Sequence, residues 1–334
     1  MLRIAIDAMG GDCGPRAIIS GALAAARDLS AGLVLVGREA EVRAEVDRAG
    51  GTAVPVAIVD ADDIVGMDEP PAAALRRKLR ASIRVAAEVV RRGDAAALFS
   101  AGSTGATVIA ACSAFGMLDG VDRPALAATV PGRRGAAVLL DAGANATCRP
   151  RHLVQFAVMG SAYAQVALGI ERPRVGLLST GAEETKGNSL TREAHRLLKN
   201  ADVPFIGNVE AHRVYSGLAD VMVCDGFTGN IALKVSEGLA EMIVDIVGEE
   251  LRPSHGAAVS PAARRAIRRI RRGIDYSEYG GAPLLGIAGL AVVGHGRSSA
   301  RAVRNAVAMA HRFASEDIVR RIARGIAASG GARA

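Results

Sequence analysis

Short apolar runs alternate with amphipathic stretches along nearly the whole chain. Runs typical of buried strands lie near residues 2–6, 33–36, 54–58, 95–98, 126–130, 137–140, 174–178, 204–206, 219–223 and 290–293. Stretches with helical spacing lie near residues 15–27, 39–48, 72–92, 103–115, 151–168, 189–199, 229–250, 261–272, 299–313 and 315–328. This alternation predicts an α/β fold, a mostly parallel sheet with helices on both faces. No linker or repeat divides the pattern, so we expect a single domain over residues 1–330 and a frayed glycine-rich tail at 329–334.

One segment departs from this alternation. Between residues 236 and 272 an acidic helix meets a basic one across Pro253–Gly256, which predicts a helical hairpin that projects from the body. In the basic helix, a period of 3.6 residues places isoleucines on one stripe and arginines on the opposite arc. Such an arc suits an acidic carrier protein or an anionic membrane surface, and the alternative is that it packs on the acidic helix of the hairpin. The candidate contact residues are Arg264, Arg265, Ile267, Arg268 and Ile270.

Composition and charge narrow the classes of partner. Half of the 334 residues are hydrophobic, aromatic residues make up 3%, and there is no tryptophan. Few rings are therefore present to stack on bases, so nucleic acid is not an expected partner. The formal net charge of +7 points to acidic partners.

Cysteine usage and the start of the chain indicate a cytoplasmic protein. Cys13, Cys112, Cys148 and Cys224 are far apart and lack the spacing of metal ligands, which favours reduced thiols. The first residues carry a charge where a signal peptide needs an apolar segment, and no uncharged stretch is long enough to cross a membrane. No cluster of carboxylates stands at ligand spacing either, so we expect no metal.

Polar loops that follow the apolar runs carry the candidate chemistry. They lie at residues 7–12, 100–105, 141–145, 179–188, 225–230 and 294–296. In an open parallel sheet all such loops lie along one edge, so we expect their backbone N–H groups and helix N-termini to converge on one crevice that favours anions. For the 225–230 loop taken alone, an ordinary helix cap with turn glycines is the better explanation, and the convergence with the other loops favours a binding role.

Individual residues in these loops suggest roles. Thr228 and Asn230 add donors beside two glycines that let the backbone approach a ligand. Lys186 next to a glycine is a good partner for phosphate, although neighbouring glutamates could pair with it. Ser103, Asp225 and His295 occur in the order of a serine hydrolase triad, which makes serine thioester hydrolysis a rival interpretation.

Taken together, the loops resemble the phosphate acyltransferase (PlsX) family of bacterial phospholipid synthesis. The matching segments follow the family's order over nearly the whole chain: residues 7–12, 100–106, 139–145 with 152–156, 186–188, 207–210, 224–230 and 275–285. The chain departs from the family at Ser103, where asparagine is expected, at Ser179–Thr180 and at Arg297. These replacements keep hydrogen-bonding capacity.

The resemblance implies a reaction, a fold and partners. Members make acyl-phosphate from acyl-acyl carrier protein and orthophosphate, for glycerophospholipid synthesis. The implied fold is a Rossmann-like α/β/α sandwich related to isopropylmalate dehydrogenase. The implied state is a homodimer that associates peripherally with the membrane, where a downstream membrane acyltransferase uses the product. No cofactor is implied.

The chemistry of that reaction suits the residues present. Phosphate at neutral pH is already nucleophilic and a thiolate leaves readily, so fixed donors and alignment replace a triad. We expect Lys186 and the backbone of 102–105 and 226–230 to bind phosphate, and Asn188 or Asn230 to stabilise the oxyanion. His295 or Asp225 would move protons or orient neighbours. The candidate substrate-binding residues are Asp7, Gly10, Gly11, Gly102, Ser103, Thr104, Gly105, Asn145, Gly226, Thr228 and Gly229. A non-catalytic scaffold that binds carrier protein or membrane is a further alternative.

Overall fold

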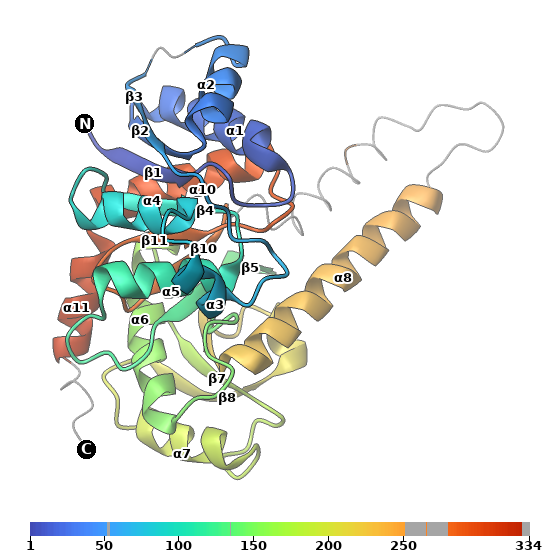
Figure 1. Cartoon of the computed structure of the whole chain (residues 1–334). Helices are drawn as coiled ribbons and strands as arrows, with labels where there is room; N and C mark the ends of the chain where they lie inside the picture. The colour runs from blue at the N-terminus through green and yellow to red at the C-terminus, as the bar shows by residue number, and fades with distance from the viewer. Residues whose placement is uncertain (52–53, 134, 251–264, 266–279, 329–334) are drawn as a thin grey trace.

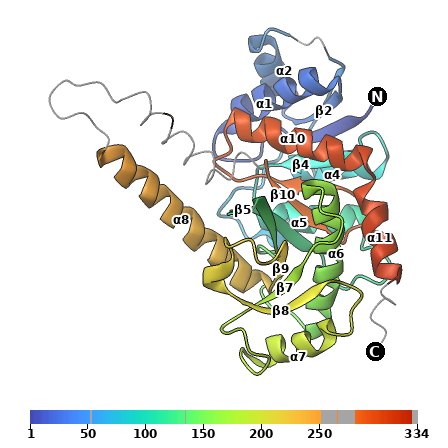
Figure 2. The ribbon, with the colours of Figure 1, turned by 180° about the vertical axis from the view of Figure 1, so that it is seen from behind.

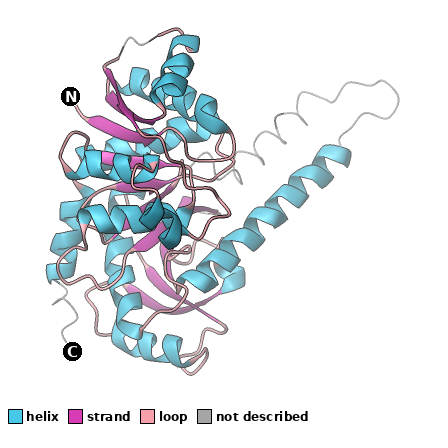
Figure 3. Ribbon diagram, in the orientation of Figure 1, coloured by secondary structure: helices cyan, strands magenta, loops and turns pink. Residues whose placement is uncertain are grey.

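The computed structural model describes residues 1–51, 54–133, 135–250, 265 and 280–328. Within these ranges the strands form one eleven-stranded sheet in the order β3-β2-β1-β4-β11-β10-β5-β6-β9-β7-β8 (Figures 1 and 3). The strands are β1 (Arg3–Asp7), β2 (Gly32–Gly37), β3 (Val56–Asp60), β4 (Ala97–Ser100), β5 (Ala125–Gly132), β6 (Gly135–Leu140), β7 (Val175–Ser179), β8 (Phe205–Glu210), β9 (Val221–Val223), β10 (Ala282–Leu285) and β11 (Ala291–Val293). The expected α/β class is confirmed.

Strand direction reverses in the middle of this sheet. Strands β3, β2, β1, β4 and β11 are mutually parallel, and so are β6, β9, β7 and β8. Between them, the pairs β11–β10, β10–β5 and β5–β6 are all antiparallel. Three reversals leave the two parallel sets pointing in opposite directions. The expectation that one parallel sheet brings every loop to the same edge is therefore wrong, because the loops belong to two sets of strands.

Helices cover both faces of the sheet, as predicted. One apolar layer lies under α1, α6, α7, α10 and α11, and the other under α3, α4, α5 and the first turns of α8 (Figure 2). The helices are α1 (Gly14–Leu29), α2 (Glu39–Arg48), α3 (Pro71–Arg77), α4 (Ser82–Arg91), α5 (Thr104–Phe115), α6 (Pro150–Leu168), α7 (Ser189–Leu198), the short 3-10 helix η1 (Ala211–Arg213), α8 (Gly226–Glu250), α10 (Ala300–Ser315) and α11 (Ile318–Ala328). None of the helices in the described ranges is both long enough and apolar enough to cross a membrane.

Two elements differ from the sequence expectation for identifiable reasons. The single helix expected at 72–92 is split into α3 and α4, because the backbone leaves the helical region at Lys78 (φ −97°, ψ 82°) and then pairs with Asp63. The Asp63 amide donates to the Arg80 carbonyl at 3.3 Å, and the Ser82 amide donates to the Asp63 carbonyl at 2.9 Å. Strand β10 was not expected, since Pro283 cannot donate to a ladder and proline is rare inside sheets. Here Pro283 lies opposite Val292 in the antiparallel pair with β11.

Helix α8 runs away from the sheet and projects from the body (Figure 1). It supplies the acidic arm of the expected hairpin. The basic arm, with Arg264, Ile267, Arg268 and Ile270, lies outside the described residues, and of the candidate contacts only Arg265 is described, as an exposed side chain.

Helices α1 and α10 pack unusually closely at Gly21. A Cβ atom added at this position would lie 2.3 Å from the carbonyl oxygen of Ala300 and 2.7 Å from the side chain of Val303. We expect Gly21→Ala to lower the free energy of unfolding by about 1–3 kcal/mol, because a backbone atom cannot move aside cheaply. Denaturant unfolding measures the change.

Gly238 in α8 is the matched control, since a Cβ there meets nothing within 4 Å. We expect Gly238→Ala to raise the free energy of unfolding by about 0.5–1 kcal/mol through lower backbone entropy of the unfolded chain. Equal effects of the two substitutions would contradict the close packing of α1 on α10.

Candidate active site

The loops after β1, β4 and β11 form one group, held by backbone contacts. The amide of Asp12 donates to the carbonyl of Gly296 at 2.7 Å, and the amide of Gly294 donates to the carbonyl of Ser100 at 2.7 Å. Gly10 has no room for a side chain, because a Cβ there would lie 2.7 Å from the amide nitrogen of Gly102. The first loop group is thus residues 7–12, 100–105 and 294–296, and it contains seven of the candidate binding residues together with His295.

A buried carboxylate holds this first loop group in place through hydrogen bonds. Asp7 is 2% exposed, and the hydroxyl of Ser100 donates to its Oδ2 at 2.7 Å. The same Ser100 oxygen accepts from the amide of Gly102 at 3.1 Å. The Gly102 amide is therefore engaged within the protein. Burial raises the pKa of Asp7, although the Ser100 hydrogen bond opposes this shift.

The α5 N-terminus lies at the surface of the same group. Ser103 is the N-cap residue, and its hydroxyl accepts from the amide of Ala106 at 3.5 Å. Thr104 is exposed in the first turn, where helix amides lack intrahelical partners. A Cβ at Gly105 would lie 2.8 Å from Pro71 of α3, so this glycine serves the packing of α3 on α5.

The loops after β6 and β9 form a second loop group, residues 141–145 and 225–230, around another buried carboxylate. Oδ1 of Asp141 accepts from the amides of Leu126, Gly143 and Ala144 at 2.8–3.0 Å. Its Oδ2 accepts from the backbone amide and the side-chain amide of Asn145 at 2.8 and 2.7 Å. Burial raises the pKa of Asp141, and these hydrogen bonds oppose the shift. Sequence reasoning did not assign this role to Asp141.

The side chain of Asn145 also forms hydrogen bonds within the second loop group. Its side-chain amide also donates to the carbonyl of Pro124 at 2.6 Å, and the residue is buried. Both hydrogen bonds hold the loop, so the Asn145 side chain positions the backbone beneath the candidate site.

The start of α8 is capped by Asp225 and packed on the Asp141 loop. Carboxylate oxygens of Asp225 accept from the amide and hydroxyl of Thr228 at 2.9 and 2.8 Å. The amide of Gly229 donates to the Asp225 carbonyl, and that of Gly226 donates to the Asn145 carbonyl. A Cβ at Gly229 would lie 1.9 Å from the carbonyl oxygen of Asp141, so only glycine fits there. These three amides are thus hydrogen-bonded within the protein.

Asn230 and the loop after β7 complete the set of candidates. Asn230 is exposed and its side chain lies beside Gly143. Asn188 caps α7 by accepting from the amide of Thr191 at 2.9 Å, and Lys186 is exposed on the loop before it. Lys186 does not line the cavity described next.

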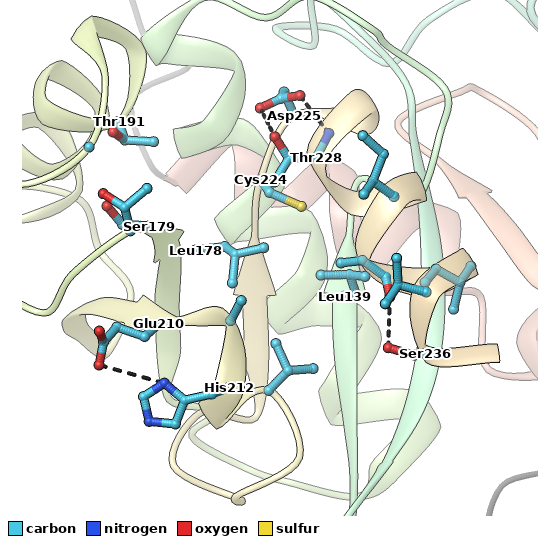
Figure 4. Close-up of a pocket in the computed structure, with 18 of the residues that line it drawn as sticks. Leu139, Leu178, Ser179, Thr191, Glu210, His212, Cys224, Asp225, Thr228 and Ser236 are labelled. Carbon is cyan, nitrogen blue, oxygen red and sulfur yellow. Dashed lines mark hydrogen bonds and ion pairs between the residues drawn. The ribbon is translucent and has the colours of Figure 1, made fainter. Parts of the chain in front are cut away.

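An apolar cavity of about 740 Å³ opens between β7, β9, η1 and the first turns of α8. Figure 4 shows Leu139, Leu178 and Cys224 in its interior, with Asp225 and Thr228 at one end and the Glu210–His212 ion pair at another. The volume falls within the roughly 300–1,000 Å³ typical of small-molecule sites. We call it the α8 pocket. Asn188, Asp225 and Thr228 are the candidates that line it.

Lys234 and His295 connect the two loop groups. Nζ of Lys234, two turns into α8, lies 3.3 Å from Nε2 of His295 on the loop after β11. Burial, followed by the charge of Lys234, lowers the pKa of His295. Lys234 also pairs with Glu237 at 2.8 Å. Lys234 was missed from the sequence, where it reads as an ordinary solvent-facing residue of an amphipathic helix.

The contacts do not favour the serine hydrolase alternative. The hydroxyl of Ser103 caps α5, the carboxylate of Asp225 caps α8, and Nε2 of His295 lies next to Lys234. Each member of the suggested triad is thus held in a different contact, whereas a triad needs the nucleophile and base in direct hydrogen bonding.

The thiols of the half-buried Cys148 and the buried Cys224 are also unsuited to form an acyl-enzyme. Burial raises the pKa of Cys148 to about 12 and raises that of Cys224 well above its usual range. A thiol that stays protonated at neutral pH is a poor nucleophile. Among the described residues, no group of histidine, cysteine and acidic side chains could hold a metal ion.

The raised pKa of Asp7 predicts a pH-dependent stability. The folded state binds this proton more tightly than the unfolded state, so the free energy of unfolding falls as pH rises from about 4, the ordinary value of the carboxyl group, towards the folded pKa. Asp7→Asn keeps an acceptor for Ser100 and cannot ionise. We expect a flatter profile of unfolding free energy in urea between about pH 4 and pH 8 than in the wild type.

Asp28→Asn is the control, because Asp28 is exposed and pairs with Arg304 on the surface. That variant should keep the wild-type slope. An Asp7→Asn profile as steep as the wild type would show that Asp7 is not the group responsible.

Comparison with known proteins identifies the family of the chain. The sequence pattern of the family described as fatty acid synthesis protein matches residues 2–321. The phosphate acyltransferase of Pelotomaculum thermopropionicum is 48% identical over 331 residues, which cover 98% of this chain and 95% of that protein. The phosphate acyltransferase of Desulforamulus reducens is 46% identical over 321 residues, which cover 96% of each.

Solved structures share the fold at low sequence identity. A phosphotransacetylase from Streptococcus pyogenes has a TM-score of 0.66 and 18% identity, with 94% of both chains covered. A branched-chain phosphotransacylase from Enterococcus faecalis V583 has a TM-score of 0.58 and 15% identity, with 94% of this chain and 99% of that one covered. The relatives at 46–48% identity confirm the resemblance that the loop motifs indicated. The chain belongs to the fatty acid synthesis protein family and, within it, to the phosphate acyltransferases.

Proposed function

We propose that this enzyme transfers the acyl group of acyl-acyl carrier protein to orthophosphate, which releases acyl-phosphate and the carrier thiol. Family membership supports acyl transfer to phosphate. The structural observation that carries the proposal is the α8 pocket, an apolar cavity with Asn188, Asp225 and Thr228 among its lining residues. That combination suits a substrate with a long apolar tail and a polar reacting end.

The acyl chain occupies the interior of the α8 pocket in this proposal. Its walls near Leu139 and Leu178 are buried aliphatic side chains, and Cys224 adds a protonated thiol that behaves as a small apolar group. Each buried methylene contributes about 0.8 kcal/mol, so binding free energy increases with chain length until the pocket is full. The thioester then lies at the polar end, beside Thr228 and Asn188.

The reaction itself needs alignment and charge stabilisation more than proton chemistry. An oxygen of HPO₄²⁻ attacks the thioester carbon, the carbon–sulfur bond breaks, and the phosphate proton ends on the departing thiolate. The side-chain amide of Asn188 uses only its oxygen in the α7 cap, which leaves its NH₂ group to donate to the developing oxyanion. Lys186 is the expected charge partner for phosphate on the same loop.

The proposal extends to the partners of the enzyme. A row of exposed apolar side chains along α8 supports a homodimer, because such rows are normally covered. Its members are Phe227, Ile231, Val235, Leu239, Met242 and Ile246. The net charge of +7 supports an acidic carrier protein and peripheral contact with an anionic membrane surface, where a downstream membrane acyltransferase takes up the acyl-phosphate.

The reaction can be tested with one assay. Acyl-acyl carrier protein is incubated with the enzyme, with and without orthophosphate, and acyl-phosphate is trapped with hydroxylamine. We expect carrier thiol and acyl hydroxamate to appear together and only when phosphate is present. Release of free fatty acid without phosphate would indicate a thioesterase, and binding of the carrier without turnover would indicate a scaffold.

The location of the acyl chain can be tested by filling the α8 pocket. Ser236 lines it from α8, and its hydroxyl donates to the carbonyl of Ala232 on the same helix. We expect Ser236→Phe to lower kcat/KM for a long-chain acyl carrier protein by roughly tenfold or more, the loss of about two methylene contacts, and to spare a short-chain substrate. Ser236→Ala, which adds no bulk, is the control. Equal losses for both chain lengths would place the acyl chain elsewhere.

A further inference from the structure

We infer that His195 and Asn208 position the turn that carries Lys186, so that its ammonium group is directed at phosphate. This inference rests on the proposed function. His195 lies on α7 and Asn208 on β8, and both are buried, with 5% and 7% of their surfaces exposed. Nδ1 of His195 lies 2.8 Å from Oδ1 of Asn208. These two side chains thus contact each other in the interior, beside the loop that follows β7.

The hydrogen bonds of this pair lead to the turn. The side-chain amide of Asn208 donates to the carbonyl of Glu183 at 2.8 Å, and a carbonyl can only accept. Oδ1 of Asn208 therefore faces the imidazole, so Nδ1 of His195 carries a hydrogen and donates to it. The Glu183 carbonyl also accepts from the amide of Lys186 at 3.1 Å. A continuous chain of hydrogen bonds thus joins the interior of α7 to the backbone of Lys186.

The imidazole at the inner end of this chain is fixed by its surroundings. The His195 ring packs edge to face on Phe205, with 5.1 Å between the ring centroids. Its Nε2 lies 3.7 Å from a carboxylate oxygen of Glu184, which pairs with Lys199 at the end of α7. Both neighbours limit rotation of the ring, so the hydrogen on Nδ1 stays directed at Asn208.

At the outer end, the turn sets the direction of the Lys186 side chain. Its stem packs directly on the loop backbone, because a Cβ at Gly181 would lie 2.7 Å from Cγ of Lys186. Leaving a buried acceptor without its donor is costly, so loss of the His195 donor favours movement of Asn208 and of the Glu183 carbonyl bound to it. Lys186 then loses its direction, whereas the apolar walls of the α8 pocket stay in place.

A kinetic experiment separates this positioning role from a general one. His195→Leu cannot donate to Asn208. We expect it to raise KM for orthophosphate by about fivefold or more, which corresponds to one lost neutral hydrogen bond, and to leave KM for acyl-acyl carrier protein nearly unchanged. His195→Asn, whose amide nitrogen stands near the position of Nδ1, should recover most of the affinity. An equal rise of both KM values, or an unchanged KM for orthophosphate, would overturn the inference.

Tyr163→Phe is the matched control for lost stability. Tyr163 is fully buried on α6, and its hydroxyl shares one hydrogen bond of 2.8 Å with that of Thr129. We expect this variant to unfold at lower urea concentration and to keep the wild-type KM for orthophosphate. A rise as large as that of His195→Leu would attribute the effect to stability and contradict the positioning role.

A double-mutant cycle tests whether the effect passes through Lys186. If His195 acts on phosphate through the lysine, His195→Leu should add little to KM for orthophosphate once Lys186→Met is present. Fully additive effects would show that His195 acts by another route and overturn the inference.

Two further measurements do not depend on turnover. NMR of the ring nitrogens in the wild type should show a hydrogen on Nδ1 of His195, and its absence would break the chain and overturn the inference. Titration with orthophosphate alone, followed at the Lys186 amide resonance, should show weaker binding in His195→Leu than in the wild type, and equal affinities would overturn the inference. If the wild type binds phosphate in this way and yet forms no acyl-phosphate, the proposed function fails and the positioning role stands.

Discussion

The reversal of strand direction between β11 and β6 is the constraint on which the site depends. Three consecutive antiparallel pairs turn one parallel set against the other, so the candidate loops come from two opposite edges of the sheet. Contact between the two loop groups therefore needs an element that crosses from one to the other. Helix α8 does this, since it begins on the Asp141 loop and brings Lys234 to His295.

Each loop group is organised by its own buried aspartate at a strand end. Asp7 holds Ser100 and, through it, the Gly102 amide. Asp141 gathers five N–H donors from β5 and its own loop. Burying a carboxylate is costly unless donors surround it, so these positions tolerate little change. Several glycines and amides that the sequence suggested as ligand-binding groups pack the loops on these anchors.

The local pattern of apolar and polar residues was enough to predict most of the helices and strands. It did not predict strand direction or contacts between residues far apart in the sequence. The apolar runs at 2–6, 33–36 and 137–140 correspond to strands, because buried strands need continuous apolar residues. Pro283 concealed β10, and the backbone pairing of residues 80–82 with Asp63 divided a helix that looked continuous. Strand direction leaves no local trace, so two loop groups could not be distinguished from one. The polar loops could therefore be located in the sequence, whereas the contact between Lys234 and His295 could not be predicted.

Helix α8 contributes to several features of the structure along its length. Its first turn is capped by Asp225, its next turns form a wall of the α8 pocket and carry Lys234, and its exposed apolar row extends outward to Ile246. A straight helix of 25 residues is about 37 Å long and transmits tilt and rotation along its whole length. The outer half of α8 and the wall of the α8 pocket therefore belong to one continuous helix, so a displacement of the outer end would also displace that wall.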